Sequence, residues 1–575
     1  MQTQKVARGV LVASLLGACS AALAVPDPIV NIIPLPNSNT PANPSVSNDG
    51  RYIAYRVGVG GFINIYVRDT VTGQDVQANL RVTDGSPVNA ACDSPVMSGD
   101  GRYVAFGCRA TEMGAVTTAN VGYFVYDRIA NRTELVPDLG SDIPLVLAFT
   151  GLSKDGRYLV FRTANTTTRA WKIHVRDLVN KTTTTTTAQY AGVPGESRMY
   201  ISDDGRLITY TGRFDVNQTP VELLVFDRTT GITEIQSLRP NGGRGLYGIR
   251  DVSASDDGMT VAFVSNDNQL VTPAGPNALA IYVRNRRSGV TELMDRNLTT
   301  NLYMNALSGN GRYVAYANIT VKVYDRWTKM TRSIPAPGVS SSTYPRMSSD
   351  GRYVVFNCAR TAAAGGGQCM GYVDMGVAPD VKLSTKQLAL TEGGIAGTYT
   401  AVLTQAPTSD VKVKVATSSQ LALARTELTF TPLNWSTPQV ISVQAVQDGV
   451  AEGLHTANLT HTVTSADVYY SVIPSMSVSA AISDAVVPTI VLPQEATWDK
   501  PELPLTGVAS PGATVLLTAV NRDTGWLTSA SIVADSQGNW SYTLTGLTSG
   551  VFDLDAQADG IKSAVKTVTV TLPTN

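Results

Sequence analysis

The segment SNDGRYIAY at residues 47–55 returns six more times along the chain with small changes. The later copies are SGDGRYVAF at 98–106, SKDGRYLVF at 153–161, SDDGRLITY at 202–210, SDDGMTVAF at 255–263, SGNGRYVAY at 308–316 and SSDGRYVVF at 348–356. From one copy to the next the turn glycine advances by 40 to 55 residues. Repetition at such a period indicates an architecture built from one supersecondary unit.

A second mark, of the form I-x-V-x-D-R, follows each turn glycine by 14 to 27 residues. It ends at Asp69, Asp127, Asp177, Asp227, Asn285, Asp325 and Asp374. Asp-Gly and Asn-Gly tolerate the positive φ of a tight hairpin turn. The runs around them are β-branched and aromatic and nearly continuously apolar, as in strands covered on both faces. Each copy therefore predicts a four-stranded antiparallel sheet, and sheets of this kind stack radially into a closed β-propeller.

The two marks together resemble the PD40 (WD40-like) repeats of TolB-type propellers from bacterial exported proteins. The resemblance covers about residues 29–378, although Met259 and Asn285 depart from the pattern. It implies a seven-bladed ring, yet copy seven ends before it reaches an outer strand. We predict that the strand-like run Ile29–Leu35 supplies that missing strand and seals the ring; the alternative is a disordered leader.

Composition and charge restrict the class of protein. Of the 575 residues 43% are apolar and 16% charged, and 45 basic residues face 46 acidic ones. Disorder needs low hydrophobicity with high net charge, and binding to a phosphate backbone needs a basic patch. We therefore expect folded domains and no nucleic-acid partner. No run after the first residues approaches 18 apolar residues, so no transmembrane segment is predicted.

The first 24 residues have the form of a signal peptide. Lys5 and Arg8 precede the apolar run 10–23, and Ala22-Leu23-Ala24 offers a small-x-small cleavage site. The alternative is a lipid anchor at Cys19, because Leu16-Gly17-Ala18-Cys19 resembles a bacterial lipobox. Either route predicts an exported protein of the periplasm, the cell surface or the medium.

Four cysteines remain after that segment: Cys92, Cys108, Cys358 and Cys369. An even number in an exported chain indicates disulfides. Cys92 and Cys108 flank a predicted turn almost symmetrically, and Cys358 and Cys369 bracket a triple-glycine loop. We predict these two local pairs; a metal site is the alternative, but CxxC spacing and nearby His are absent.

Two further all-β modules follow the repeats. Residues 379–486 show short alternating runs typical of a β-sandwich. Their segments TEGGIAGTYTAVL and HTVTSADVYY resemble Calx-β-like bacterial repeats. Residues 487–575 resemble a bacterial immunoglobulin-like module through GVASPGATVLL and ADSQGNWSYTL, with Trp540 alternating inward. The predicted fold class is therefore all-β: a seven-bladed propeller over residues 25–378, then two β-sandwich domains.

The Calx-β resemblance implies a calcium site at one end of the sandwich. Calcium takes six to eight oxygen ligands, which acidic loops can supply together. The matching positions here are Glu392, Asp448, Glu452, Asp467 and Asp484. The alternative is that these residues only decorate turns. Calcium is the one cofactor for which the sequence gives any candidate.

No catalytic constellation emerges. The three histidines, His174, His455 and His461, are expected to be structural or surface residues. The repeated Asp and Arg of S-x-D-G-R are expected to serve turn hydrogen bonding and contacts between blades, because an active site needs one unique arrangement. A carboxylate pair for glycoside cleavage remains open at the blade turns, with Asp203, Asp204, Asp256 and Asp257 as its candidates.

Function then follows only by analogy of fold. We expect an exported binding or scaffolding protein that recognises a protein or peptide through its propeller. The rivals are a propeller-based hydrolase acting on carbohydrate or peptide, and a calcium-dependent cell-surface adhesin. Carboxylates clustered at the channel mouth would favour the hydrolase.

Overall fold

A computed structural model describes the chain from residue 28 to residue 573 with short gaps. The gaps are at 36–37, 39, 41, 116, 118–120, 138–141, 145–149, 166–170, 188–197, 214–219, 277, 297, 299–304, 319, 448–453, 484–485, 494–496, 511 and 559–560. The protein is all-β, and the described helical turns are the short 3-10 helices η1 (Asn268–Leu270) and η2 (Ala362–Ala364). The chain divides into two compact units, one ending at Gly376 and one starting at Val377.

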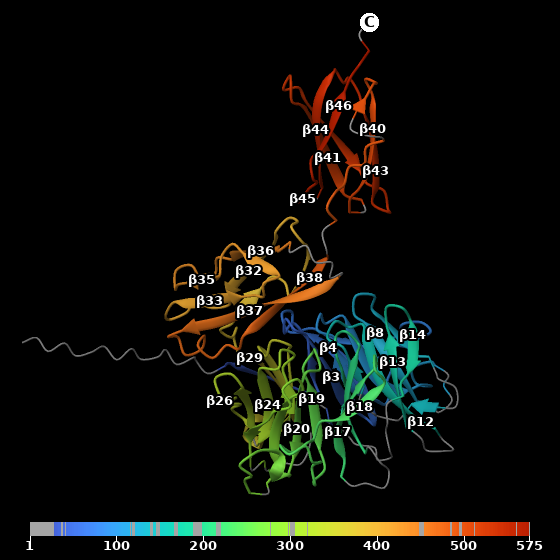
Figure 1. Ribbon diagram of the computed structural model, residues 1–575. Coiled ribbons are helices and arrows are strands. Elements are labelled where there is room, and N and C mark those ends of the chain that lie inside the picture. Colours follow the sequence, from blue (N-terminus) through green and yellow to red (C-terminus); the bar gives the residue numbers. More distant parts are fainter. Residues whose placement is uncertain are drawn as a thin grey trace, which may run out of the picture. The chain divides into compact units, whose positions relative to one another are not determined.

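Seven antiparallel sheets, which we call blades 1 to 7, make up the first unit (Figure 1). Blade 1 contains β2 (Ser45–Val46), β3 (Tyr52–Val59), β4 (Phe62–Asp69) and β5 (Asp75–Gln77), and blade 2 contains β6 (Cys92–Met97), β7 (Tyr103–Arg109), β8 (Val121–Asp127) and β9 (Arg132–Leu135). Blade 3 contains β10 (Asp142–Pro144), β11 (Gly151–Leu152), β12 (Tyr158–Asn165), β13 (Trp171–Asp177) and β14 (Thr182–Thr185). Blade 4 contains β15 (Tyr200–Ile201), β16 (Leu207–Gly212), β17 (Glu222–Asp227) and β18 (Ile232–Ile235).

Blades 5 to 7 repeat this order. Blade 5 contains β19 (Asp251–Ala254), β20 (Thr260–Ser265), β21 (Ala280–Asn285) and β22 (Thr291–Asp295), and blade 6 contains β23 (Asn305–Leu307), β24 (Tyr313–Asn318), β25 (Thr320–Asp325) and β26 (Met330–Ser333). Blade 7 contains β27 (Val339–Met347), β28 (Tyr353–Arg360), β29 (Gln368–Asp374) and, from the start of the chain, β1 (Val30–Pro34). The first strand of each blade in this order lies innermost, except in blade 3, where β10 and β11 both pair with β12.

Strand β1 closes the ring, as the sequence predicts. It pairs antiparallel with β29, with Ile32 opposite Gly371 and Pro34 opposite Cys369. The sheet order β1-β29-β28-β27 makes β1 the outer strand of blade 7. The inner strand of blade 7, β27, in turn contacts β2 of blade 1. The ring is therefore held by strands from both ends of the repeat region.

The S-x-D-G turns have the predicted chemistry. Their seven glycines have φ between 67° and 80°. In blade 2, Ser98 Oγ donates to Asp100 Oδ1 at 2.5 Å, and that oxygen also accepts from the Arg102 N–H at 2.9 Å. Each Asp, or Asn310 in blade 6, thus holds its own turn closed.

The predicted contact of the repeated Arg with a neighbouring blade is wrong. Arg102 binds Asp127 of the same blade, with Nη2 at 2.8 Å from Oδ2. The two residues are close because Arg102 directly precedes β7 and Asp127 ends the antiparallel strand β8, at the same end of the sheet. Equivalent pairs occur in five other blades. Within this motif it is the turn glycine that approaches a neighbouring blade: a Cβ on Gly101 would lie 2.6 Å from the Tyr52 ring of blade 1.

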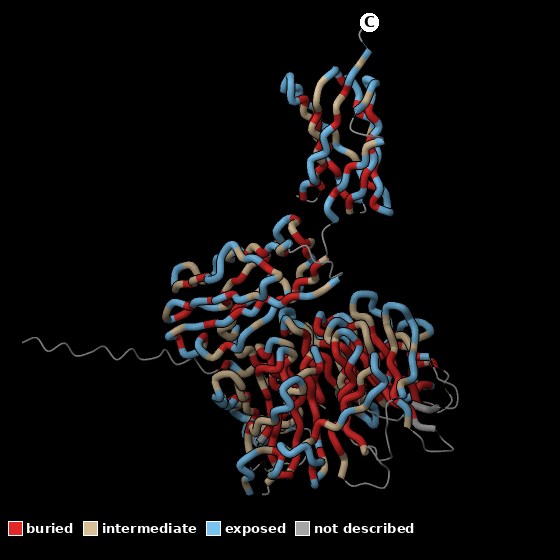
Figure 2. The backbone as a smooth tube through the Cα atoms, in the orientation of Figure 1, coloured by how far each residue is buried: buried red, intermediate tan, exposed pale blue. Residues whose placement is uncertain are grey.

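Apolar layers fill the spaces between blades. Val160 of blade 3 and Ile208 and Leu224 of blade 4 belong to one buried cluster. Figure 2 shows buried residues running along the strands while the turns are exposed. Burial on both faces explains why the strand sequences are continuously apolar.

Both predicted disulfides are present within blades. Cys92–Cys108 joins β6 to β7, and Cys358–Cys369 joins β28 to β29. Each bridge links residues that are directly opposite in the strand pairing. Local pairing by hairpin geometry is thereby confirmed.

Two β-sandwiches make up the second unit. The sheets of the first contain β30 (Val381–Leu383), β32 (Gly397–Leu403), β36 (Gln439–Ala445) and β34 (Leu421–Leu423), and β31 (Gln387–Thr391), β38 (Met476–Ser483), β37 (His455–Ser465), β33 (Val411–Ala416) and β35 (Glu427–Phe430). Those of the second contain β39 (Thr497–Trp498), β46 (Lys566–Val570), β44 (Gly550–Ala558), β41 (Thr514–Asn521), β42 (Leu527–Val533) and β45 (Ile561–Lys562), and β40 (Leu503–Val508) and β43 (Asn539–Leu544). Trp540 lies in the core of the second, as predicted.

The leader and its two interpretations, cleavage after Ala24 or lipid attachment at Cys19, lie outside the described residues. In the described part of the chain, no helix has the length and apolar character that crossing a membrane requires.

Candidate functional site

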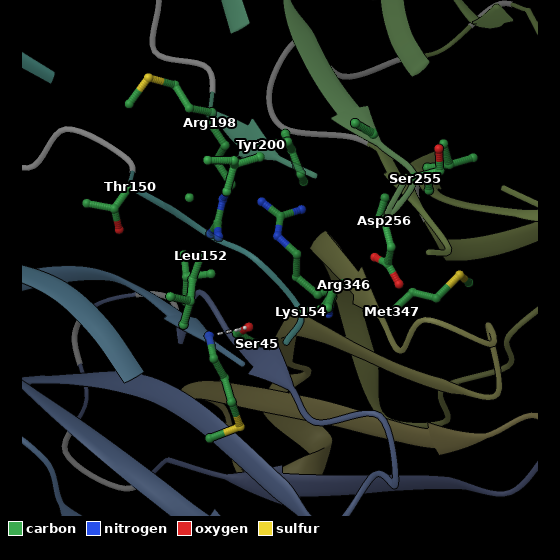
Figure 3. Close-up of a pocket in the computed structure, with 18 residues that line it drawn as sticks. Ser45, Thr150, Leu152, Lys154, Arg198, Tyr200, Ser255, Asp256, Arg346 and Met347 are labelled. Atoms are coloured by element: carbon green, nitrogen blue, oxygen red, sulfur yellow. Dashed lines mark hydrogen bonds between the residues drawn. The ribbon is translucent and has the colours of Figure 1, made fainter. Parts of the chain in front are cut away.

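The inner strands of the blades surround a central cavity (Figure 3). It has a volume of about 80 Å³, enough for several water molecules or the end of one side chain. Residues of all seven blades line it, because each blade contributes its inner strand or the turn beside it. Differences between the seven repeats therefore face one another in this cavity.

One layer of the cavity wall is aliphatic. Met97, Leu152, Ile201, Leu307 and Met347 all line it, and each directly precedes the Ser of its S-x-D-G turn. All five side chains are buried. Methionine adapts its shape to what packs against it, so this wall suits an apolar segment of varied outline.

Two arginines enter the cavity from different blades. Arg198 precedes β15 of blade 4 and Arg346 lies in β27 of blade 7; their exposed fractions are only 4% and 9%. Figure 3 shows their side chains extending into the cavity toward one another. Burial, and next the charge of Arg346, lower the pKa of Arg198 to about 9. The two guanidiniums therefore repel each other in a site of low dielectric.

The bonds of these two side chains differ. Arg198 Nη2 donates to Asn43 Oδ1 at 2.5 Å. Arg346 Nη1 donates to the carbonyl of its neighbour Pro345 at 2.7 Å, and its Nε is buried without an acceptor among the described residues. Asp251 and Asp93 act on Arg198 in the opposite sense, since their charges favour its protonated form. Asp93 is itself ion-paired with Arg56.

Strained backbone surrounds the arginine pair on three adjacent blades. Asn43, Ser94 and Tyr344 have φ of 46°, 56° and 52°, and each is followed by proline. A residue before proline ordinarily adopts extended backbone, and conformations such as these cost about 1–3 kcal/mol each. The strand pairing shifts register between Asp93 and Val96 and between Thr343 and Arg346.

The sequence contains a signal for this feature that sequence reasoning missed. In copies 1, 2 and 7 alone the repeat is extended backward to P-x-x-S-x-D-G, beginning at Pro44, Pro95 and Pro345. Because the ring closes between blades 7 and 1, these three copies are neighbours in space. The extended motif therefore marks one sector of the cavity.

The carboxylates singled out in the sequence fall into two groups. Asp204 and Asp257 accept hydrogen bonds from Ser202 and Ser255 within their own turns, both at 2.5 Å. Asp203 lies at the ring of turns, where its Oδ1 accepts from the Lys154 N–H at 2.7 Å.

Asp203 and Asp256 are neighbours. The Asp203 N–H donates to the Asp256 carbonyl at 2.8 Å, and the Asp256 N–H donates to the Gly309 carbonyl at 2.9 Å. Burial, and next the charge of Asp256, raise the pKa of Asp203 to about 6. The charge of Asp256 therefore acts on the Asp203 carboxylate, whose Oδ1 is engaged in holding adjacent turns together.

Of the five residues proposed for calcium, the two that the structure describes lie far apart in their sheet. Glu392 follows β31, while Asp467 follows β37; β31 runs parallel to β38 and β37 antiparallel to it, so the two residues lie at opposite ends of the sheet. The Asp467 carboxylate accepts from the Thr408 N–H at 2.7 Å and from its hydroxyl at 2.8 Å. These two bonds tie the Asp467 carboxylate to the turn at Thr408, and its part in a calcium site stays a prediction. Asp448, Glu452 and Asp484 lie outside the described residues.

Within the described ranges, no cluster of three or more His, Cys, Asp or Glu side chains has the arrangement of a metal site. Two of the three histidines are core residues. His174 lies between Thr163 and Thr185, at 2.7 Å and 3.0 Å, and His461 contacts the Tyr399 hydroxyl at 2.7 Å. Both are fully buried, which confirms their structural role.

Comparison with known proteins gives likenesses of fold. No protein-family model and no curated protein matches the chain. An oligogalacturonate lyase solved in complex with manganese is 11% identical (TM-score 0.43; 60% of this chain, 96% of that one). An oligogalacturonate lyase from Vibrio parahaemolyticus is 13% identical (TM-score 0.42; 60% and 91%), and TolB from Acinetobacter baumannii is 13% identical (TM-score 0.33; 57% and 65%). The propeller assignment itself rests on the sheet order and ring closure described above.

Proposed function

We propose that this chain is an exported binding or scaffolding protein whose propeller recognises a protein or peptide partner in its central cavity, without catalysis. One observation supports this most: an aliphatic, methionine-rich wall lies beside two buried arginines in the central cavity. A wall of this kind accepts apolar side chains, and a small number of charged groups fixes their orientation. The two disulfides are compatible with an oxidising, extracytoplasmic compartment. The two sandwiches then act as spacers.

The rival function, hydrolysis of a carbohydrate or peptide, has one observation in its favour. Asp203 and Asp256 are adjacent, and a carboxyl with a pKa near 6 suits a general acid. The Asp203 carboxylate, however, already accepts two backbone N–H bonds, from Lys154 at 2.7 Å and from Asp155 at 3.3 Å. This engagement favours a role in the ring of turns over one in catalysis.

A matched pair of variants tests recognition in the cavity. Met347→Gln changes the cavity wall, while Met330→Gln makes the same change at an exposed position on β26. The full chain, immobilised, is exposed to a detergent extract of the native envelope, and the affinity of each captured polypeptide is measured. Loss of apolar contact at Met347 should weaken binding by about tenfold, and Met330→Gln should not change it.

Two outcomes would count against the proposal. A polypeptide held equally by both variants would place recognition outside the cavity. Hydrolysis of an oligosaccharide or peptide by the wild type, abolished in Asp203→Asn, would establish the rival function instead.

A further inference from the structure

The arginine pair differs from the arginines of the repeated S-x-D-G-R motif. Elsewhere the repeated Arg binds an Asp of its own blade, as Arg102 binds Asp127. Buried charges are ordinarily paired in this way, because removing an ion from water is costly. Arg346 is nine-tenths buried, yet among the described residues no carboxylate lies within ion-pair distance of it. Its guanidinium instead faces that of Arg198 across the cavity (Figure 3).

The backbone aims Arg346 at this position. The bulge in β27 between Thr343 and Arg346 contains the Tyr344-Pro345 step, with φ of 52° at Tyr344. A bulge redirects the side chains of a strand, and strained backbone of this kind persists where the surrounding structure holds it. The position of the Arg346 guanidinium therefore costs free energy twice, through backbone strain at Tyr344 and through repulsion by Arg198. A ligand of negative charge would relieve the repulsion.

We propose that a carboxylate of the partner polypeptide enters the cavity and is held between the guanidiniums of Arg198 and Arg346. This inference rests on the proposed function and specifies its chemistry. The planar fork of N–H donors on arginine matches the two oxygens of a carboxylate. Arg346 retains a buried Nε for such an acceptor.

The surrounding wall favours a peptide as the source of the carboxylate. Leu152, Ile201 and Met347 lie in the same cavity as the two arginines and present hydrocarbon. The methylene groups of a glutamate, and an aliphatic neighbour on either side, pack against such a wall. A uronic acid would place hydroxyl groups against it, each needing a hydrogen-bond partner.

Four probes test this chemistry on the full chain by calorimetry at millimolar concentration. They are the capped tripeptide Leu-Glu-Leu, its analogue Leu-Gln-Leu, digalacturonate and inorganic phosphate. Leu-Glu-Leu should bind at least about tenfold more tightly than Leu-Gln-Leu, because a hydrogen-bonded charge is exchanged for a neutral amide. Arg346→Met should abolish the difference. Arg287→Met, at an exposed turn of blade 5, should preserve it.

Thermal unfolding separates a ligand site from a merely structural one. Without ligand, Arg346→Met should unfold at the same temperature as the wild type or higher, because the repulsion with Arg198 is gone. Leu-Glu-Leu should raise the unfolding temperature of the wild type and leave that of Arg346→Met unchanged. Unfolding of the ligand-free variant at a clearly lower temperature would assign Arg346 a structural role and overturn the inference.

Failure of the carboxylate site can be distinguished from failure of polypeptide recognition in the cavity. Equal binding of the two peptides, unaffected by Arg346→Met, would overturn the carboxylate site and leave recognition in the cavity standing. Binding of digalacturonate or phosphate that depends on Arg346, with neither peptide bound, would overturn both proposals. No binding of any probe would overturn the carboxylate site.

Discussion

At the scale of single residues, each S-x-D-G glycine satisfies two requirements at once. Gly50 has φ of 70°, which only glycine adopts freely, and a Cβ there would lie 2.4 Å from the Tyr353 ring. Tyr353 belongs to blade 7 and Gly50 to blade 1, so this contact lies at the junction where the ring closes. The same glycine that makes the turn also lets the neighbouring blade approach.

Gly50→Ala should therefore lower the free energy of unfolding by about 2–4 kcal/mol. Positive φ accounts for about 1 kcal/mol and the clash with Tyr353 for the rest. Gly85→Ala is the control, because Gly85 has φ of 73° with nothing within 4 Å of its Cβ position. Chemical denaturation measures both. An equal loss of unfolding free energy in the two variants would show that the Tyr353 ring does not clash with a Cβ at position 50.

Asp203 links stability to pH. Its pKa is about 6, whereas an unfolded aspartate titrates near pH 4, so the folded state binds the proton more tightly. The resulting stabilisation is fully present below about pH 4 and is lost as the pH rises through about 6. Asp203→Asn should remove this part of the pH dependence, measured as urea unfolding from pH 4 to pH 7.

Asp256→Asn tests what raises the pKa of Asp203. Removing the Asp256 charge should move the Asp203 transition to lower pH without abolishing it, since burial is the larger cause of the shift. A profile of Asp203→Asn that parallels the wild type would contradict the assignment of the transition to this carboxyl.

Residue roles were predictable where the chemistry is local. The turn role of Asp100 and the Cys92–Cys108 pairing follow from spacing along a hairpin, and both hold. The partner of Arg102 was not predictable, because the sequence does not say which strand end lies beside it. Arg198 and Arg346 were missed because no other copy has arginine at the corresponding position and because the two meet only when the ring is closed.

At the scale of elements, β1 matters most because it comes from outside the repeats. Ile32 packs against the core of blade 7, and Ile33 against the cluster shared with blade 1. Its partner β29 would otherwise present an unpaired edge, a site of aggregation or strand exchange.

Replacing Ile32 and Ile33 together by Asp should release β1. We expect a loss of about 2 kcal/mol, from two half-buried side chains, and faster amide hydrogen exchange in β29. Asn31→Asp, at an exposed position of the same strand, should leave exchange in β29 unchanged. Unaltered exchange in the double variant would show that β1 does not stabilise β29.

The pairing of β1 with blade 7 was predictable from a count of strands. Copy seven lacks one strand of a four-stranded blade, and Ile29–Leu35 is a strand-like segment that belongs to no copy. The bulges of β6 and β27 were not, because register shifts leave no periodic signature. Only the added proline of P-x-x-S-x-D-G marks them.

In the whole molecule, the residues that the seven copies share determine the propeller fold. The residues that differ between the copies determine the lining of the central cavity. Seven equivalent turns place seven inner strands around one axis, so the fold can be inferred from what the copies share. The cavity depends on what they do not share, and a sequence alone does not show which unequal residues face one another.

Recognition of a polypeptide inside this cavity would bring the partner within reach of the inner strands. A photoreactive benzoylphenylalanine placed at Tyr200, which lines the cavity, tests it in cells that make the full chain. The control position is Val290, exposed in the turn between β21 and β22. Irradiation should give a polypeptide adduct at Tyr200 that Arg346→Met removes, and none at Val290. An adduct at Val290 alone, or none at either position, would show that no polypeptide is recognised inside the cavity.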